Sequence, residues 1–398
     1  MQYKSLVFFV EINDLEFSFI VGDNINEEQF KIIFTNSIPI KGIQDNKITN
    51  LDLVCNTLKE NILKIEKKVN FVFKEVILVI NNFNFTLNSC TGFKKLNGSQ
   101  LTKENITYIL NSLKLLISET EQDKKIIHIF NSRYFLDKKE TTNLPIGLFG
   151  NFYSHELSFF LINNNDYKNL KNIFDKCNLK INKIISKSFI EGVNLINLNK
   201  NSESFFKIEI KDTNSQIILF KNSSLKFVQN FKFGSNLILS DISKIIAIKE
   251  DLVKDMLFNQ TFFNENFDNE YLEKKYFQSQ NFRKIKKKLI YEIAEARIFE
   301  LAEKILLKNL NINNFLKKNI TIFLQVKDKN CFNSFEKIFM NSFSFKKKYD
   351  LKNLENLNIE SLYESANKLV QYGWKKEAVP IIQENNSIIA RFFNYIFK

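Results

Sequence analysis

The sequence predicts an α/β fold in which one layered domain occurs twice, with a small α+β insertion in the first copy. Strand-like segments open the chain at residues 5–34, and the same strand-turn-strand-strand pattern returns from residue 205. Helical and apolar segments follow each group, as in layered α/β domains. In addition, 398 residues are too many for a single hydrophobic core.

The first copy begins with three short segments of alternating character, at residues 5–12, 16–22 and 29–34. Such alternation is typical of half-buried strands. Residues 50–69 then place apolar side chains at helical spacing, namely Leu51, Val54, Leu58, Ile62 and Ile65. The run "EVILVI" at 75–80 is apolar throughout, which indicates a strand buried on both faces.

Residues 81–163 interrupt this pattern and form the predicted insertion. They contain a strand "NFTLNSC", a helix "TKENITYILNSLKLLISE" and the strands "KIIHIFNSRYFLD" and "HELSFFLI". A helix at 165–179 returns the chain to the first copy. The mixture of long strands and one helix predicts a small α+β unit.

The second copy repeats the opening order. Its expected elements are strands at 205–210, 215–220 and 224–234, helices within 236–310, a strand at 319–326 and a helix at 359–372. Repetition at this scale favours a duplicated fold.

Composition limits the functional classes. The formal net charge is +13, yet no basic motif interleaved with aromatic residues is present, so we expect no nucleic-acid partner and a preference for anionic lipid. No apolar run reaches the roughly 18 residues of a membrane span, and the first residues lack an export signal. The scattered cysteines predict free thiols in a reducing cytoplasm; they are Cys55, Cys90, Cys177 and Cys331.

Metal or nucleophilic chemistry is not expected. His128 and His155 are the only histidines, and neither has a partner set at metal-ligand or catalytic-triad spacing. We therefore predict no catalytic residues, no metal site and no resident cofactor.

The last residues form a two-sided pattern. Apolar pairs recur every four residues within 387–398, and basic residues flank them; the residues are Ile388, Ile389, Arg391, Phe392, Phe393, Ile396, Phe397 and Lys398. On a helix the apolar pairs make one stripe. We predict an amphipathic helix that lies in a membrane interface. The alternative is a helix that packs on the protein's own core.

Several motifs occur in the order of a known family. Residues 128–150 resemble the insertion-domain stretch of the FtsA family of bacterial cell-division proteins, through Tyr134, Asp137, Pro145, Gly147, Leu148 and Gly150. Residues 233–242, 293–301 and 361–373 resemble later motifs of that family. The resemblance implies the duplicated actin-like (ribonuclease H-like) fold with the FtsA-type insertion.

The resemblance also implies a division into subdomains. These are subdomain 1A at 1–80 and 164–204, insertion subdomain 1C at 81–163, subdomain 2A at 205–235 and 319–373, subdomain 2B at 236–318, a linker at 374–386 and the membrane-targeting helix at 387–398.

Actin-like proteins hold ATP phosphates between two hairpin turns that are rich in glycine and hydroxyl groups, which is where this chain departs from the family. Asn13 and Asp14 stand at positions that resemble glycine and threonine, and Glu16 at one that resembles lysine. The second turn resembles an aspartate-isoleucine-triple-glycine-threonine run, but it reads Glu209, Ile210, Lys211, Asp212, Thr213 and Asn214.

The missing glycines keep backbone N–H groups away from phosphate, and added carboxylates repel it. We expect weak or absent ATP binding, no meaningful hydrolysis and hence no enzyme. Lys211 or Asn214 could still reach an anion; the alternative is an ordinary polar turn. An active ATP-binding protein of the family, holding ATP with Mg, is the first alternative overall.

By resemblance, the function is a scaffold that tethers the tubulin-like FtsZ filament to the inner face of the plasma membrane at the division site. Expected partners are the FtsZ C-terminal tail, anionic lipid, further copies of the chain and other divisome proteins through 81–163. The FtsZ tail is expected on 236–318, where Lys287 and Arg297 are candidate contacts in a basic region. An actin-like pilus or secretion assembly protein is the second alternative.

Overall fold

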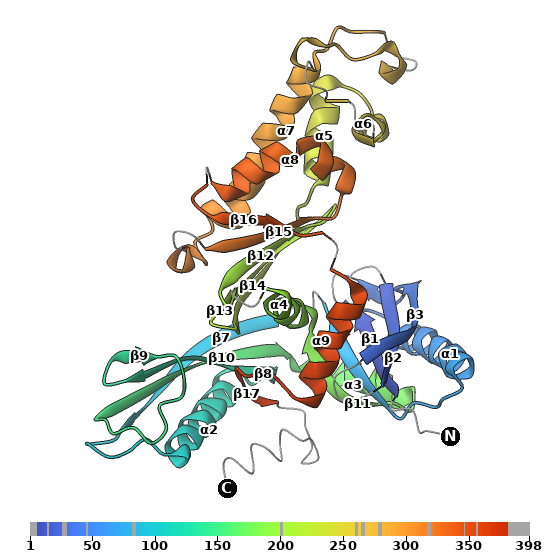
Figure 1. Ribbon diagram of the computed structural model, residues 1–398. Helices are drawn as coiled ribbons and strands as arrows, with labels where there is room; N and C mark the ends of the chain where they lie inside the picture. Colours follow the sequence, from blue (N-terminus) through green and yellow to red (C-terminus); the bar gives the residue numbers. More distant parts are fainter. Residues whose placement is uncertain are drawn as a thin grey trace. The chain divides into compact units, whose positions relative to one another are not determined.

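The computed structural model describes residues 6–13, 16–25, 30–44, 47–81, 85–199, 202–258, 262–263, 267–277, 281–316, 320–345, 347–355 and 357–380. The chain divides into two compact units (Figure 1). The first comprises Met1–Asn201, Lys221–Lys226 and Asn358–Lys398, and the second Ser202–Phe220 and Phe227–Leu357. Each unit is built around its own five-stranded sheet.

The sheet of the first unit has the order β11-β6-β1-β2-β3. Its strands are β1 (Leu6–Ile12), β2 (Glu16–Asn24), β3 (Phe30–Pro39), β6 (Glu75–Ile80) and β11 (Lys180–Ser186). β2 is antiparallel to both β1 and β3, whereas β6 runs parallel to both β1 and β11. The short strands β4 (Ile43–Gln44) and β5 (Lys47–Ile48) form a separate hairpin.

Helices cover this sheet: α1 (Leu51–Val69), α3 (Asn164–Lys176), α4 (Lys187–Leu198) and α9 (Ile359–Gln371). α1 packs with α3, and α4 packs with α9. The Asn50 side chain caps α1 by accepting a hydrogen bond from the Leu53 N–H, and Asn70 ends the helix at a φ of 52°. Four of the five predicted apolar positions of α1, namely Val54, Leu58, Ile62 and Ile65, are buried and Leu51 is half-buried, which confirms its amphipathic pattern.

The insertion forms a second sheet in the first unit, with the order β17-β8-β10-β7. Its elements are β7 (Phe85–Lys95), α2 (Lys103–Thr120), β8 (Lys124–Leu136), β9 (Lys139–Thr141), β10 (Phe152–Asn163) and β17 (Glu377–Pro380). The apolar face of α2 packs on this sheet, against a core that includes Tyr153 and Phe159. The helix lies so close to β7 that a Cβ on Gly92 would stand 2.5 Å from the Cγ2 atom of Ile109.

The sheet of the second unit has the order β14-β13-β12-β15-β16. Its strands are β12 (Phe205–Ile210), β13 (Ser215–Lys221), β14 (Ser224–Phe231), β15 (Thr321–Val326) and β16 (Asp350–Asn353). When the strands of each sheet are numbered 1 to 5 in chain order, their spatial order across the sheet is 3-2-1-4-5 in both units. The duplicated α/β fold predicted from the sequence is therefore confirmed.

One apolar core holds the helices of the second unit to this sheet. The main helices are α5 (Asn236–Ile246), α6 (Glu250–Phe258), α7 (Lys287–Ala302) and α8 (Lys329–Ser344). Short turns of 3-10 helix lie at η1 (Phe267–Asn269), η2 (Lys274–Phe277) and η4 (Asn313–Phe315). A π-helical turn, η3 (Glu303–Leu307), continues α7.

Two features differ from the expected domain boundaries. Helix α9 belongs to the first unit, although the sequence places 319–373 in the second copy. The reason is that α9 packs on α4 and β3. In addition, the expected linker 374–386 contains strand β17, which pairs with β8. Within the described residues, no helix is long and apolar enough to cross a membrane.

Candidate functional site

The first candidate phosphate turn joins β1 to β2 and is closed by its own groups. The Asn13 N–H donates to the Glu16 carbonyl at 3.2 Å, and the Glu16 N–H donates to Asn13 Oδ1 at 2.8 Å. The Glu16 carboxylate accepts a hydrogen bond from the Ser18 hydroxyl at 3.1 Å. Asp14 lies outside the described residues. Asn13 thus uses its side-chain oxygen to hold the turn together.

Just before this turn lies Glu11, a residue that the sequence analysis missed. It is 3% exposed, and its carboxylate forms an ion pair with Lys187 at the start of α4. The Tyr363 hydroxyl on α9 donates to the other carboxylate oxygen at 2.8 Å. Burial, together with Glu11, holds the pKa of Tyr363 well above its usual range, so the hydroxyl keeps its proton. The sequence signal was a single carboxylate within the apolar strand "LVFFVEI".

The second candidate turn joins β12 to β13 and packs on the beginning of α5. The Lys211 N–H donates to the Asn214 carbonyl at 2.9 Å, which closes the turn. The N–H groups of Ser235 and Asn236 donate to the carbonyls of Lys211 and Asp212, each at 2.9 Å. A helix N-terminus offers such N–H groups to anions. Here these two already have backbone partners, so they are not available to phosphate.

Gly234 makes this packing possible. A Cβ at this position would stand 2.1 Å from the Lys211 carbonyl oxygen and 2.6 Å from that of Asp212. Only glycine therefore allows the turn and the start of α5 to approach so closely. Thr213, at the tip of the turn, is exposed.

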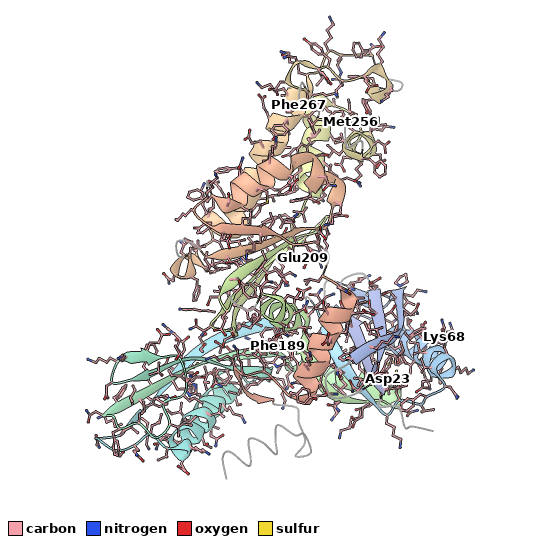
Figure 2. The ribbon with its side chains drawn as sticks, in the orientation of Figure 1. Asp23, Lys68, Phe189, Glu209, Met256 and Phe267 are labelled. Atoms are coloured by element: carbon pink, nitrogen blue, oxygen red, sulfur yellow. The ribbon has the colours of Figure 1, made fainter. Side chains whose placement is uncertain are left out.

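Glu209 is the counterpart of Glu11 in the second unit. Each is the residue before the last of its strand, and β1 and β12 hold the same place in the two sheet orders. Glu209 lies on β12, as Figure 2 marks, and is 7% exposed. Its carboxylate pairs with Lys207 at 3.5 Å and with Lys327 at 3.3 Å. Both equivalent carboxylates are thus neutralised by lysines of their own unit.

The two candidate contacts for an acidic partner are engaged within the second unit. Lys287 is 7% exposed, and its ammonium donates to the Phe262 carbonyl at 2.9 Å and to the Glu270 carboxylate at 2.7 Å. Arg297 pairs with Asp241 and with Glu300, both at 2.5 Å. These side chains hold helices and loops together. Their partners Phe262, Glu270 and Asp241 lie on other segments of the chain, so the basic run in the sequence did not reveal them.

The remaining expectations concern the tail and metal chemistry. All residues of the expected membrane helix, 387–398, lie outside the described residues. In the part of the chain that the structure describes, no group of three His, Cys, Asp or Glu side chains is placed to hold a metal ion. His128 and His155 are buried in the insertion sheet.

Curated proteins similar to this chain carry the name "Cell division protein FtsA". The relative from Buchnera aphidicola subsp. Acyrthosiphon pisum is 23% identical over 251 residues, which is 62% of this chain and 59% of the relative. The relative from Escherichia coli K12 is 18% identical over 60% of this chain and 57% of its own length. The matched segment thus spans less than two thirds of each relative. No protein-family model matches the chain.

Among solved structures, the "PilM-PilN type IV pilus biogenesis complex" superimposes with a TM-score of 0.55 at 8% sequence identity. The alignment covers 92% of this chain and 95% of that one. At this identity the likeness is evidence of a shared fold. The chain is thus similar in sequence to FtsA over about 60% of its length, and its repeated 3-2-1-4-5 sheet order fits an actin-like fold.

Proposed function

We propose that the chain is a division scaffold that tethers an FtsZ filament to the inner face of the plasma membrane and helps to assemble the divisome. The observation that carries the division role is the sequence similarity to FtsA over 62% of the chain. The duplicated sheet order supports the same relationship at the level of the fold. We propose a protein without ATPase activity.

Membrane attachment is assigned to residues 387–398 on the basis of their apolar stripe. Six large apolar side chains would contribute roughly 9–18 kcal/mol if fully buried. Partial insertion and the ordering of a dozen residues, at about 1–2 kcal/mol each, offset most of this. A single tail would therefore bind reversibly, whereas many tails on one polymer would bind firmly through effective concentration.

The nucleotide part of the proposal is that ATP binds weakly or not at all. Three features of the separate units support it. The β1–β2 turn is closed by Asn13. The N–H groups of Ser235 and Asn236 at the start of α5 donate to the carbonyls of Lys211 and Asp212. Lysines neutralise Glu11 and Glu209. In each unit, a built-in ammonium group thus stands beside the carboxylate that could otherwise attract a metal ion.

An acidic FtsZ tail is proposed to bind the second unit within 236–318. Because Lys287 and Arg297 have internal partners, we assign the attraction to exposed neighbours, Lys284, Lys286 and Lys288. Charge complementarity of this kind mainly raises the association rate and is weakened by salt. We also propose that the chain associates with further copies of itself and that residues 81–163 contact other divisome proteins.

The membrane and FtsZ parts are tested together by co-pelleting. Anionic vesicles are mixed with the full chain or with a variant lacking 387–398, with and without FtsZ. We expect the full chain to pellet and to carry FtsZ with it, and the folded, truncated chain to remain in the supernatant. Equal pelleting of both chains would contradict the tail assignment. Vesicle binding without FtsZ capture would contradict the FtsZ part of the proposal, whereas a tail that does not bind vesicles would favour the pilus or secretion alternative.

The nucleotide part is tested by the effect of Mg-ATP on stability. At 1 mM Mg-ATP we expect the free energy of unfolding to rise by less than about 0.5 kcal/mol. The reason is that stabilisation by a ligand grows with the ratio of its concentration to its Kd, and this ratio is small for a weak ligand. A site with a Kd of about 10 μM would raise it by about 2.7 kcal/mol. Calorimetric binding of Mg-ATP at low micromolar strength would instead support the active ATP-binding alternative.

A further inference from the structure

The segment 374–380, here called the C-terminal arm, is attached first to the turn between β13 and β14 and then to the insertion sheet. The Trp374 indole N–H donates to the Ser223 carbonyl at 2.6 Å. The Asn131 N–H on β8 donates to the Lys376 carbonyl at 2.7 Å. From Glu377 to Pro380 the arm becomes strand β17, which is antiparallel to β8. Figure 1 shows the two strands next to each other. The expected linker therefore contains a strand.

A buried charge cluster holds the centre of the arm. The Glu377 side chain is 1% exposed, accepts a hydrogen bond from His128 Nδ1 at 2.8 Å and pairs with the Lys183 ammonium at 3.5 Å. Lys183 also donates to the Leu369 carbonyl at the end of α9, at 3.1 Å. The cluster thus joins the arm to β8, β11 and α9. Undocking the arm would leave the buried Lys183 without its counter-charge, which is unfavourable.

The protonation states fit a permanent attachment. Burial alone would raise the pKa of Glu377, but Lys183 and the His128 hydrogen bond outweigh it and lower this pKa to about 2. Burial lowers the pKa of His128, so the ring is neutral and donates its Nδ1–H. Glu377 therefore stays charged across the physiological range of pH.

Two neighbouring contacts extend the attachment. Ala378 is 4% exposed and belongs to the apolar core that α2 forms with the sheet. The Lys376 ammonium lies over the Tyr134 ring, 5.0 Å from its centroid, and donates to the Thr142 carbonyl at 3.4 Å. The arm therefore contributes Ala378 to the apolar core of the insertion and Lys376 to polar contacts at the surface of the insertion.

We propose that the C-terminal arm is a permanent strand of the insertion sheet and remains docked when the tail binds a membrane. The tail would then be anchored to the insertion, with only residues 381–386 as a spacer. That part of the inference rests on the proposed function, whereas docking of the arm does not. Six residues can span about 20 Å, against about 45 Å for the thirteen residues that a released arm would provide.

The single tryptophan of the chain provides the probe, because Trp374 lies in the arm. Its emission and its quenching by acrylamide are measured in solution and with anionic vesicles, and pelleting is followed in parallel. We expect vesicles to pellet the protein and to leave both fluorescence readings unchanged. A shifted emission or altered quenching in the pelleted protein would overturn permanent docking. Failure to pellet would count against membrane anchoring alone.

Trypsin tests docking without any lipid, since Lys375 and Lys376 are cleavage sites within the arm. The Glu377→Ala variant leaves Lys183 unpaired, and we expect cleavage after these lysines to be at least about tenfold faster than in the wild type. The exposed Glu360→Ala variant on α9 is the matched control and should be cleaved at the wild-type rate. Equal rates for Glu377→Ala and the wild type would overturn the proposal.

A double variant guards against a global loss of structure. In Lys183→Met with Glu377→Gln no buried charge is left unpaired, and glutamine can still accept from His128. We expect this protein to fold, by circular dichroism, and to be cleaved more slowly than Glu377→Ala. A folded double variant that is cleaved as fast as Glu377→Ala would show that the unpaired charge of Lys183 is not what releases the arm.

Discussion

The buried carboxylates Glu11, Glu209 and Glu377 each lie beside a lysine ammonium group of the same unit. Removing a carboxylate from water is costly unless its charge is compensated, and in each case the lysine reaches it from a different element or turn. The pairs therefore fix the relative positions of strands and helices. Glu209, which the sequence analysis placed in a candidate phosphate turn, thus serves first to hold the fold.

We predict that Lys187→Met destabilises the protein by about 3 kcal/mol, because it leaves buried Glu11 with Tyr363 as its polar partner. The control is the double variant Glu11→Gln with Lys187→Met, in which no unpaired charge remains and most of the stability should return. Urea unfolding of the wild type, both single variants and the double variant gives the coupling energy. A coupling energy near zero would contradict the assigned ion pair.

His155 makes stability depend on pH. Burial, together with Lys376, lowers its pKa to about 4, and its Nε2 lies 2.9 Å from Asn131 Oδ1. Since the pKa in the folded protein is below the ordinary value of about 6.5, the unfolded chain binds the proton more readily. The stabilisation is therefore complete above pH 6.5 and is lost as the pH falls toward 4.

The expected loss from this residue is about 3 kcal/mol between pH 7 and pH 4. His128 also has a lowered pKa and contributes in the same direction. For this reason the measurement compares urea unfolding of the wild type and His155→Gln at several pH values. The variant should lose less stability over this range, and parallel curves for the two proteins would exclude the assignment.

At the scale of elements, the insertion depends on close contact between α2 and β7. We predict that Gly92→Ala destabilises the protein by about 1–3 kcal/mol, because the new Cβ would stand 2.5 Å from Ile109 and 3.2 Å from Leu113. Thr91→Ala, at an exposed neighbouring position on β7, should change stability by less than about 0.5 kcal/mol. Adding Ile109→Ala to Gly92→Ala should relieve the clash but also remove apolar contact. The melting temperatures of the single and double variants would show which of the two effects is larger.

The elements also show what the sequence could predict. Local alternation and helical spacing located helix α1 and four strands of each sheet, because these patterns depend on neighbours along the chain; the edge strands β11 and β16 were missed. Strand β17 was missed because its four residues, "EAVP", carry no strand pattern of their own and pair with a strand almost 250 positions earlier. The same reason explains α9, whose place depends on packing against α4 and β3.

In the candidate phosphate turns, too, local features could be predicted from the sequence and distant partners could not. Residue types alone predicted that Asn13, Lys211 and Asp212 would not form a glycine-rich cradle. They did not predict that the turn carbonyls would accept from Ser235 and Asn236, or that Lys187 and Tyr363 would meet Glu11. Such partners are distant in the sequence and are set by the duplicated topology. A carboxylate within an apolar strand was the available signal.

At the scale of the whole molecule, the proposed docking of the arm predicts how the first unit would meet a membrane. β17 is antiparallel to β8, with Glu377 opposite Phe130 and Pro380 opposite His128. The chain therefore leaves the described residues heading toward the end of the sheet where β8 begins, at Lys124. The opposite end lies near Phe152, and the 12 residues of β10 span about 40 Å between the two ends. A short spacer should hold the first end nearer to the lipid.

We predict that a fluorescent label at Gln122, beside the start of β8, is quenched by spin-labelled lipid at least about twofold more than one at Asn151, near the other end. Both positions are exposed, and each is replaced by cysteine in a Cys90→Ser background. The native thiols left are buried, and burial raises the pKa of Cys177 to about 11 and that of Cys331 well above its usual range, so they react slowly. Glu377→Ala is the matched comparison, since a released arm should remove the difference between the two labels. Equal quenching at both positions in the wild type would mean that the arm does not orient the insertion on the membrane.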